Sequence, residues 1–126
     1  MHRILIVDDE HVVADTLNLI FLKNGFETRV TYSASAALAC APEFAPELLL
    51  CDIDMPEMDG LALIAAMRDQ QPSCRILVLT GAYGRLPHVL QRADSICPEV
   101  SILIKPCQPA NLLRKADDLL LPGAVA

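Results

Sequence analysis

Aromatic residues and long apolar runs are both scarce in this sequence of 126 residues. Trp is absent, and Phe and Tyr together make up 4% of the chain. The longest obvious apolar run extends from Leu61 to Met67, far short of the roughly 18 residues of a membrane-spanning helix. Acidic residues follow the apolar segment Ile4–Val7 at once, unlike the pattern of a secretory signal peptide. We therefore expect no membrane segment and no secretory leader.

Basic residues are also few. The chain has 10 Lys and Arg against 16 Asp and Glu, a net charge of −6, and the basic residues are scattered, with no run longer than the pair Arg114-Lys115. An acidic surface without a basic run disfavours nucleic acid or an anionic membrane as the main partner. We expect a protein partner, with no direct contact to nucleic acid and none to a membrane.

The five cysteines do not form a recognisable metal or disulfide pattern. They are Cys40, Cys51, Cys74, Cys97 and Cys107. Their number is odd, no two are spaced as C-x-x-C, and several lie within apolar runs. This spacing predicts reduced, mostly buried thiols in a cytoplasmic protein.

Apolar residues, by contrast, are plentiful. They make up 53% of the chain, enough for a core that needs neither disulfides nor a structural metal. The length suits one domain, and no internal repeat or linker is evident. We predict a single domain over residues 1–121 with a short loose tail at 122–126, and we expect no output module after the last helix.

Five short segments predict β-strands. They are Ile4–Val7, Thr28–Thr31, Leu48–Cys51, Ile76–Leu79 and Ile102–Ile104. Four of them are almost continuously apolar, as strands are in a parallel sheet that is covered on both faces. The second strand is the exception, because Glu27 and Arg29 flank its apolar positions, and it suits an edge with one wetter face.

Five segments with helical periodicity alternate with these strands. They are residues 10–24, a short Ala-rich helix capped by Ser33 or Ser35 and ending near Pro42, and residues 61–70, 87–95 and 109–121. Alternating strands and helices with short links imply right-handed crossovers. The fold class is therefore α/β, with a doubly wound five-stranded parallel sheet and five helices.

Polar residues collect where four of the strands end. Asp8-Asp9-Glu10 follow the first strand, Asp52-Ile53-Asp54 the third, Thr80-Gly81 the fourth, and Lys105-Pro106 the fifth. In such sheets the functional site lies outside the carboxyl ends of the strands. We therefore expect several carboxylates, one hydroxyl and one ammonium group at the same edge of the sheet.

This set of groups suits phosphoryl transfer. Crowded carboxylates favour a hard divalent cation, and Mg²⁺ prefers oxygen ligands. A carboxylate beside a cation, a lysine and a hydroxyl can act as the nucleophile and form an acyl phosphate. Each element alone has a plainer explanation, because acids cap helices and Asp-x-Asp-x-Pro is commonly a turn. The combination favours the chemical interpretation.

The sequence resembles the receiver domain of two-component response regulators. The matching motifs are ILIVDDE at 4–10, LLLCDIDMPEMDG at 48–60, ILVLTG at 76–81 and ILIKP at 102–106. The resemblance extends from residue 3 to about residue 120. It implies a flavodoxin-like (β/α)5 fold with strand order 2-1-3-4-5, and a chemotaxis-regulator-like receiver that stands alone or belongs to a longer chain.

The resemblance also implies roles for matched residues. Asp52 corresponds to the phosphoacceptor, Thr80 to the switch hydroxyl and Lys105 to the lysine that pairs with the phosphoryl group. Asp8, Asp9, Asp52 and the main-chain carbonyl of Asp54 correspond to the Mg²⁺ ligands, with Asp8 acting mainly through water. The implied donor is a phosphohistidine on a sensor histidine kinase or phosphotransfer protein. Beyond accepting the phosphoryl group and slowly hydrolysing it, no separate substrate turnover is expected.

The resemblance further implies the surface that changes on phosphorylation. It is formed by the helix at 87–95, the strand at 102–104 and the helix at 109–121, and it would bind a downstream protein. The chain departs from the family here, because Ile102 stands where an aromatic residue is usual. We hypothesise that Tyr83 reports activation instead, the alternative being a merely exposed loop tyrosine. Pro98 and Cys107 are further departures, and Cys107 is more simply a buried thiol than a redox group.

Two other functions stay open at this point. A pseudo-receiver would keep the fold as a binding module that does not depend on phosphorylation. A phosphohydrolase of the haloacid-dehalogenase type also uses Asp-x-Asp after a strand, as in Asp52-Ile53-Asp54. That motif normally lies near the N-terminus and has Thr or Val where this chain has Pro56, and no cap domain is evident. A monomer or weak dimer is compatible with the sequence.

Overall fold

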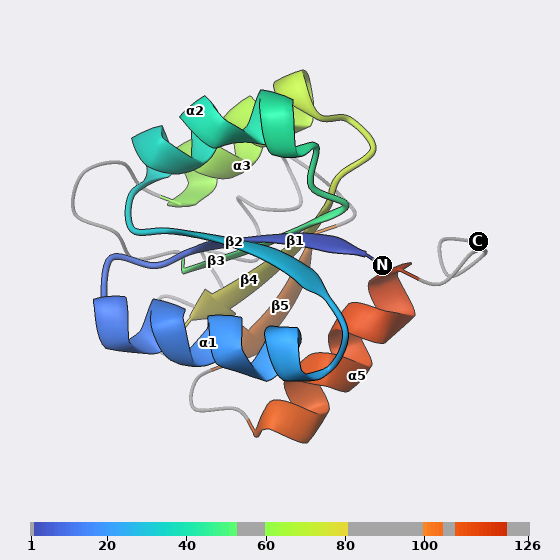
Figure 1. Ribbon diagram of the computed structural model, residues 1–126. Coiled ribbons are helices and arrows are strands. Elements are labelled where there is room, and N and C mark those ends of the chain that lie inside the picture. The colour runs from blue at the N-terminus through green and yellow to red at the C-terminus, as the bar shows by residue number, and fades with distance from the viewer. Residues whose placement is uncertain (1, 53–59, 81–99, 105–107, 121–126) are drawn as a thin grey trace.

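Five strands form one parallel sheet in the computed structural model (Figure 1), which describes residues 2–52, 60–80, 100–104 and 108–120. The strands are β1 Arg3–Val7, β2 Glu27–Thr31, β3 Leu48–Asp52, β4 Arg75–Thr80 and β5 Ser101–Ile104. Their order across the sheet is β2-β1-β3-β4-β5, and all four pairings are parallel. The predicted strand order and all five predicted strands are confirmed.

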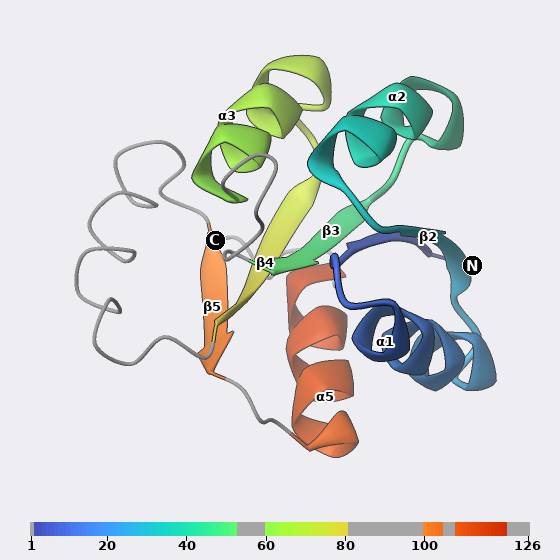
Figure 2. The same ribbon diagram turned by 90° about the vertical axis from the view of Figure 1, so that its left-hand side faces the viewer.

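Four helices within the described residues cover the two faces of this sheet. They are α1 His11–Lys23, α2 Ala34–Phe44, α3 Gly60–Gln70 and α5 Pro109–Leu120. Figure 2 shows α2 and α3 on one face and α1 and α5 on the other, as a doubly wound sheet requires. The predicted helix at 87–95, the expected α4, falls in the segment 81–99, outside the described residues.

The core consists of two apolar layers because alternate residues of a strand point to opposite faces. On the α2 and α3 side the strands contribute Leu5, Val7, Leu49, Cys51, Ile76 and Val78. On the α1 and α5 side they contribute Ile4, Ile6, Leu48, Leu50, Leu77 and Leu79. Burial of both sets explains why β1, β3 and β4 are almost continuously apolar in sequence.

Strand β2 occupies an edge, as its mixed sequence predicts. Glu27 and Arg29 are exposed, whereas Thr28 and Val30 are half-buried. An edge strand has only one neighbour, so its outer positions tolerate charge. The sequence therefore predicts the position of β2 as well as its existence.

Helix α2 differs from its prediction at one end. Ser33 caps it as expected, with its hydroxyl accepting a hydrogen bond from the Ala36 amide at 3.1 Å. The helix does not end near Pro42 but continues to Phe44, and Ala45 ends it with a left-handed φ of 51°. Pro42 is exposed and lies in the last turn of the helix, and Phe44, two residues further, adds a buried ring.

Among the described helices none is long and apolar enough to cross a bilayer. The helix boundaries otherwise fall within one residue of those predicted for α1, α3 and α5. Leu17 and Phe21 of α1, Ile64 and Met67 of α3, and Leu112 and Ala116 of α5 are buried.

Candidate functional site

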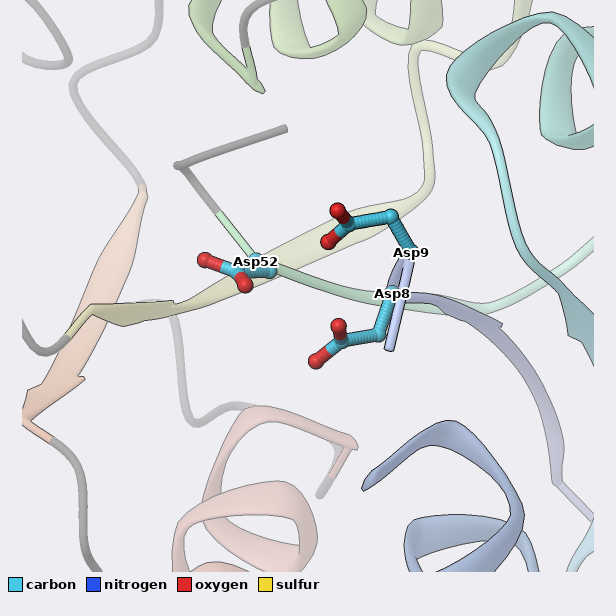
Figure 3. A group of neighbouring side chains, drawn as sticks. All are labelled: Asp8, Asp9 and Asp52. Atoms are coloured by element: carbon cyan, nitrogen blue, oxygen red, sulfur yellow. The ribbon is translucent and has the colours of Figure 1, made fainter. Parts of the chain in front are cut away.

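The register of β1 and β3 brings two acidic residues to one edge of the sheet. Val7 pairs with Cys51, so Asp8 directly after β1 lies beside Asp52, the last residue of β3. Asp9 comes from the turn that leads into α1. Figure 3 shows the three side chains gathered at the carboxyl ends of these strands, where the sequence predicts the site.

The three carboxylates form a compact acidic cluster. One oxygen from each of Asp8, Asp9 and Asp52 can be chosen so that all lie within 4.8 Å of one another. Asp8 and Asp52 are 1% and 5% exposed, whereas Asp9 is half-buried. Two of the three charges are therefore shielded from water, and the third is open to a ligand that approaches from outside.

Backbone hydrogen bonds hold Asp8 in this position. Its amide donates to the Thr31 carbonyl at 3.2 Å, and its Oδ1 accepts from the Glu10 amide at 2.9 Å. The Thr31 hydroxyl donates to the Ile6 carbonyl at 2.9 Å. The end of β2 is thus bonded both to the end of β1 and to the first acid of the site.

The negative charge of the cluster contributes to the raised pKa of a neighbouring thiol, Cys51. Burial raises the pKa of Cys51 to about 12, with smaller contributions in the same direction from the charges of Asp52, Cys74 and Asp8. Burial also raises the pKa of the Cys74 thiol to about 12. These two thiols are buried as predicted, and Cys40 is half-buried; all three are free. Cys97 and Cys107 lie outside the described residues.

The cluster has the donor set of a site for a hard divalent cation. It offers only carboxylate oxygens, which Mg²⁺ prefers to nitrogen or sulfur. Crowding three acids in a partly buried space is unfavourable without a cation, because their charges repel one another. Asp8, Asp9 and Asp52 therefore fit the predicted metal.

The other predicted site residues are described only in part. Thr80 is the last residue of β4, whose register places Leu79 beside Asp52, so its backbone lies at the same edge of the sheet. Lys105 follows Ile104, the last residue of β5, which pairs with Thr80. Lys105 itself and Asp54 lie outside the described residues, as do Tyr83 and Pro98. Ile102 is half-buried against the core on the α2 and α3 side.

A further group at this edge escaped the sequence analysis. Tyr32, the residue after β2, stacks on His11 with ring centroids 3.8 Å apart, and its hydroxyl donates to Asp15 Oδ1 at 2.6 Å. Tyr32 directly follows the second strand, as the other site residues follow theirs, but the sequence does not indicate its contacts with His11 and Asp15. Its signal was weak because β2 is short, mixed and at the sheet edge.

A sequence profile of the response regulator receiver domain matches residues 4–117. The chain belongs to this family. The receiver domain assignment agrees with the fold, the strand order and the acidic cluster, and it excludes the haloacid-dehalogenase type as the family of this chain.

Receiver domains and receiver-containing proteins are found among its relatives. The chain is 31% identical over 120 residues to chemotaxis protein CheY of Bacillus subtilis, covering 94% of this chain and 98% of that protein. It is 34% identical over 92 residues to sporulation initiation phosphotransferase F of the same organism, covering 73% of each. It is 34% identical over 106 residues to regulatory protein AtoC of Escherichia coli, covering 84% of this chain but only 22% of AtoC.

Solved structures of receivers superpose closely on this fold. Chemotaxis protein CheY4 of Vibrio cholerae has a TM-score of 0.88 at 26% identity, with 95% of this receiver and 99% of that chain covered. Response regulator TrrA of Thermotoga maritima, solved in complex with Mg²⁺ and BeF, has a TM-score of 0.81 at 27% identity, with 95% and 100% covered.

Proposed function

We propose that this receiver domain accepts a phosphoryl group on Asp52 from a phosphohistidine of a sensor histidine kinase or phosphotransfer protein. The observation that carries the proposal is the cluster of Asp8, Asp9 and Asp52 at the carboxyl ends of β1 and β3. Family membership supports it, because receivers of response regulators are phosphoacceptor domains. We further propose that the domain extends over residues 1–121, that 122–126 form a tail, and that the protein acts in the cytoplasm.

In the proposed reaction a carboxylate oxygen of Asp52 attacks the phosphorus atom. A P–O bond forms as the P–N bond to the imidazole breaks, and the imidazole nitrogen keeps the electron pair and takes up a proton. Asp52 is 5% exposed, so the surrounding protein would partly shelter its acyl phosphate from bulk water. The half-buried Asp9 marks the open side from which the donor approaches.

The acidic residues also provide the proposed metal site. Asp8, Asp9 and Asp52, with the main-chain carbonyl of Asp54, would hold Mg²⁺. When bound, this cation would neutralise charge on the transferring phosphoryl group and on the acids. Asp8 would contribute mainly through water, as the family resemblance implies, while its Oδ1 accepts the Glu10 amide.

The proposed switch starts from Thr80 and Lys105. A phosphoryl group adds about two negative charges and three acceptor oxygens, which a hydroxyl and an ammonium group can each bind. Movement of these residues would change the surface formed by β5, α5 and the segment 81–99, here proposed as the α4-β5-α5 surface, and alter binding of a downstream protein. No direct nucleic-acid contact is proposed, and the receiver would be a monomer or weak dimer.

Intact mass spectrometry after incubation with acetyl phosphate and Mg²⁺ tests the proposal. One phosphoryl adduct that hydroxylamine removes is expected for the wild type, and none for Asp52→Asn. Asp69→Asn is the matched control, because Asp69 is exposed on α3 away from the cluster and should leave the adduct intact. No adduct on the wild type, with no binding of beryllofluoride, would instead identify a pseudo-receiver that binds partners without phosphorylation.

A further inference from the structure

Apart from the hydrogen bond that the Glu10 amide donates to Asp8 Oδ1, the start of α1 has little local support of its own. Glu10 is its N-cap, but the Glu10 side chain makes no capping hydrogen bond, and no acid lies in the first turn. An N-cap side chain commonly contributes about 1 kcal/mol to a helix. The position of this turn matters, because Asp9 lies two residues before the first helical residue, His11.

Contacts from Tyr32, the residue directly after β2, provide further support for this first turn. The Tyr32 ring stacks on His11 with an angle of 20° between the ring planes, and its hydroxyl reaches Asp15 one turn further along α1. We call these three residues the Tyr32 clasp. Two turns of α1 are thereby attached to the end of β2, although Tyr32 is 21 and 17 residues away from them in sequence.

Burial does not explain the clasp. His11 and Asp15 are exposed, and Tyr32 is 37% exposed, so the three residues contribute little to the apolar core. The hydrogen bond to Asp15, followed by desolvation and that carboxylate's charge, raises the pKa of Tyr32, in agreement with its hydroxyl acting as the donor. The ring stack and the hydrogen bond both depend on the relative orientation of their partners. They therefore suit a role in holding the first turn of α1 in place better than a role in stabilising the whole fold.

Both sides of the clasp lead directly to the acidic cluster. On one side Thr31, the neighbour of Tyr32, accepts the amide hydrogen of Asp8 and is bonded through its hydroxyl to Ile6. On the other side His11 is separated from Asp9 by Glu10 alone. We propose that Tyr32 is a positioning residue for the cation site: it fixes the first turn of α1 against the end of β2 and so holds Asp9 beside Asp8 and Asp52. The inference rests on the proposed function of that cluster.

Magnesium affinity measured by isothermal titration calorimetry tests this role. Tyr32→Leu removes both the ring stack and the hydrogen bond, and we expect about threefold to tenfold weaker Mg²⁺ binding, which lies within the range of effects of residues that do not contact the ligand. Tyr32→Phe keeps the stack and should lose less affinity. Thr16→Ala is the matched control, since Thr16 is exposed on α1 and, among the described residues, its hydroxyl bonds within its own helix, to the Val12 carbonyl.

Two further readouts separate positioning from general loosening of the fold. The effects of Tyr32→Phe and Asp15→Ala on the Mg²⁺ dissociation constant should not add, because both remove one hydrogen bond. The initial rate of phosphoryl uptake by Tyr32→Leu should return to the wild-type rate at saturating Mg²⁺, since only the affinity for the cation is impaired. A structural defect would lower that rate at every Mg²⁺ concentration.

The outcomes are distinct. Wild-type Mg²⁺ affinity in a folded Tyr32→Leu variant overturns the positioning role, as does a defect that saturating Mg²⁺ does not relieve. If the wild type itself binds no Mg²⁺, the proposed function of the acidic cluster fails first. Weaker binding in Tyr32→Leu with unchanged binding in Thr16→Ala supports the clasp.

Discussion

Val7 and Cys51 are paired in register across β1 and β3, and an aspartate follows each of them. Asp8 and Asp52 are therefore brought together by the apolar residues that precede them, whose burial sets the register of the two strands. The register of the buried strands β1 and β3 thus determines the spacing of the carboxylates Asp8 and Asp52. Several consequences of this arrangement can be measured.

Removing one charge from the acidic cluster should stabilise the metal-free protein. Asp52→Asn in the presence of a chelator is expected to raise the melting temperature by about 2–5 °C, because two neighbouring carboxylates lose a repulsive partner. Added Mg²⁺ should stabilise the wild type more than the variant. Differential scanning calorimetry with and without Mg²⁺ measures both effects, with Asp69→Asn as the control. A lower melting temperature for Asp52→Asn without metal would show that other interactions of this carboxylate outweigh the repulsion.

The buried thiols should resist alkylation in the folded protein. Because the thiolate is the reactive form, the raised pKa values of Cys51 and Cys74, each about 12, leave almost none of it at pH 8. Cys40 is half-buried, and burial raises its pKa as well, with Arg29 acting in the opposite direction. Iodoacetamide labelling followed by peptide mass mapping should modify Cys40 before the other two. Equal labelling of all three in native buffer, as expected in urea, would refute this order.

Because of Glu47, the stability of the fold should depend on pH in the acidic range. Its carboxylate accepts hydrogen bonds from His2 Nδ1 at 2.9 Å and from the Arg3 amide at 3.1 Å, and the bond to His2 is the main cause of its lowered pKa. Because the folded-state pKa lies below the ordinary value of 4.5, the stabilisation is complete above that value. It is lost as the pH falls through the lowered pKa.

Urea unfolding of the wild type and Glu47→Gln from about pH 6 to about pH 3 measures this contribution. The wild type should be more stable at the upper end, and the two curves should converge at the lower end. Glu43→Gln, on the exposed surface of α2, controls for the loss of one negative charge. A gap that stays constant down to pH 3 would contradict the assignment.

The left-handed conformation of Ala45 offers a stabilising substitution. Ala45 has φ 51°, which is unfavourable for a residue with a Cβ atom. Ala45→Gly should stabilise the fold by about 0.5–1 kcal/mol, because relief of strain exceeds the added entropy of the unfolded chain. Gly25→Ala is the reciprocal control: its φ is 87° and nothing lies within 4 Å of the added Cβ, so backbone strain alone should destabilise it. Changes of the same sign in the two variants would refute the argument.

Most of the fold can be predicted from the sequence, because strands that are buried on both faces are almost continuously apolar. Leu48, Leu49 and Leu50 cannot be mistaken for a half-exposed strand, and their neighbours in β1 and β4 are alike. Pro42 misled the prediction of α2 because a proline is expected to end a helix, whereas here the helix continues for two more residues and buries Phe44.

The acidic cluster was predictable for the same reason, since parallel strands end at one edge and Asp8, Asp9 and Asp52 follow two of them. The Tyr32 clasp was not, because it joins residues 17 and 21 positions apart through side chains on the surface. Surface contacts of this kind follow from the angle between α1 and β2, which residue periodicity does not encode. The roles of all the site residues stay predictions: Asp8, Asp9, Asp52, Asp54, Thr80 and Lys105.

The edge of the sheet opposite the acidic cluster is tied together by Glu47. Its amide donates to the Arg3 carbonyl and its carbonyl accepts from the Arg75 amide, each at 2.9 Å, while its side chain accepts the Arg3 amide. These hydrogen bonds thus join three adjacent strands at their amino ends. We therefore expect the amino ends of these strands to resist separation more strongly than the carboxyl ends, where the carboxylates lie.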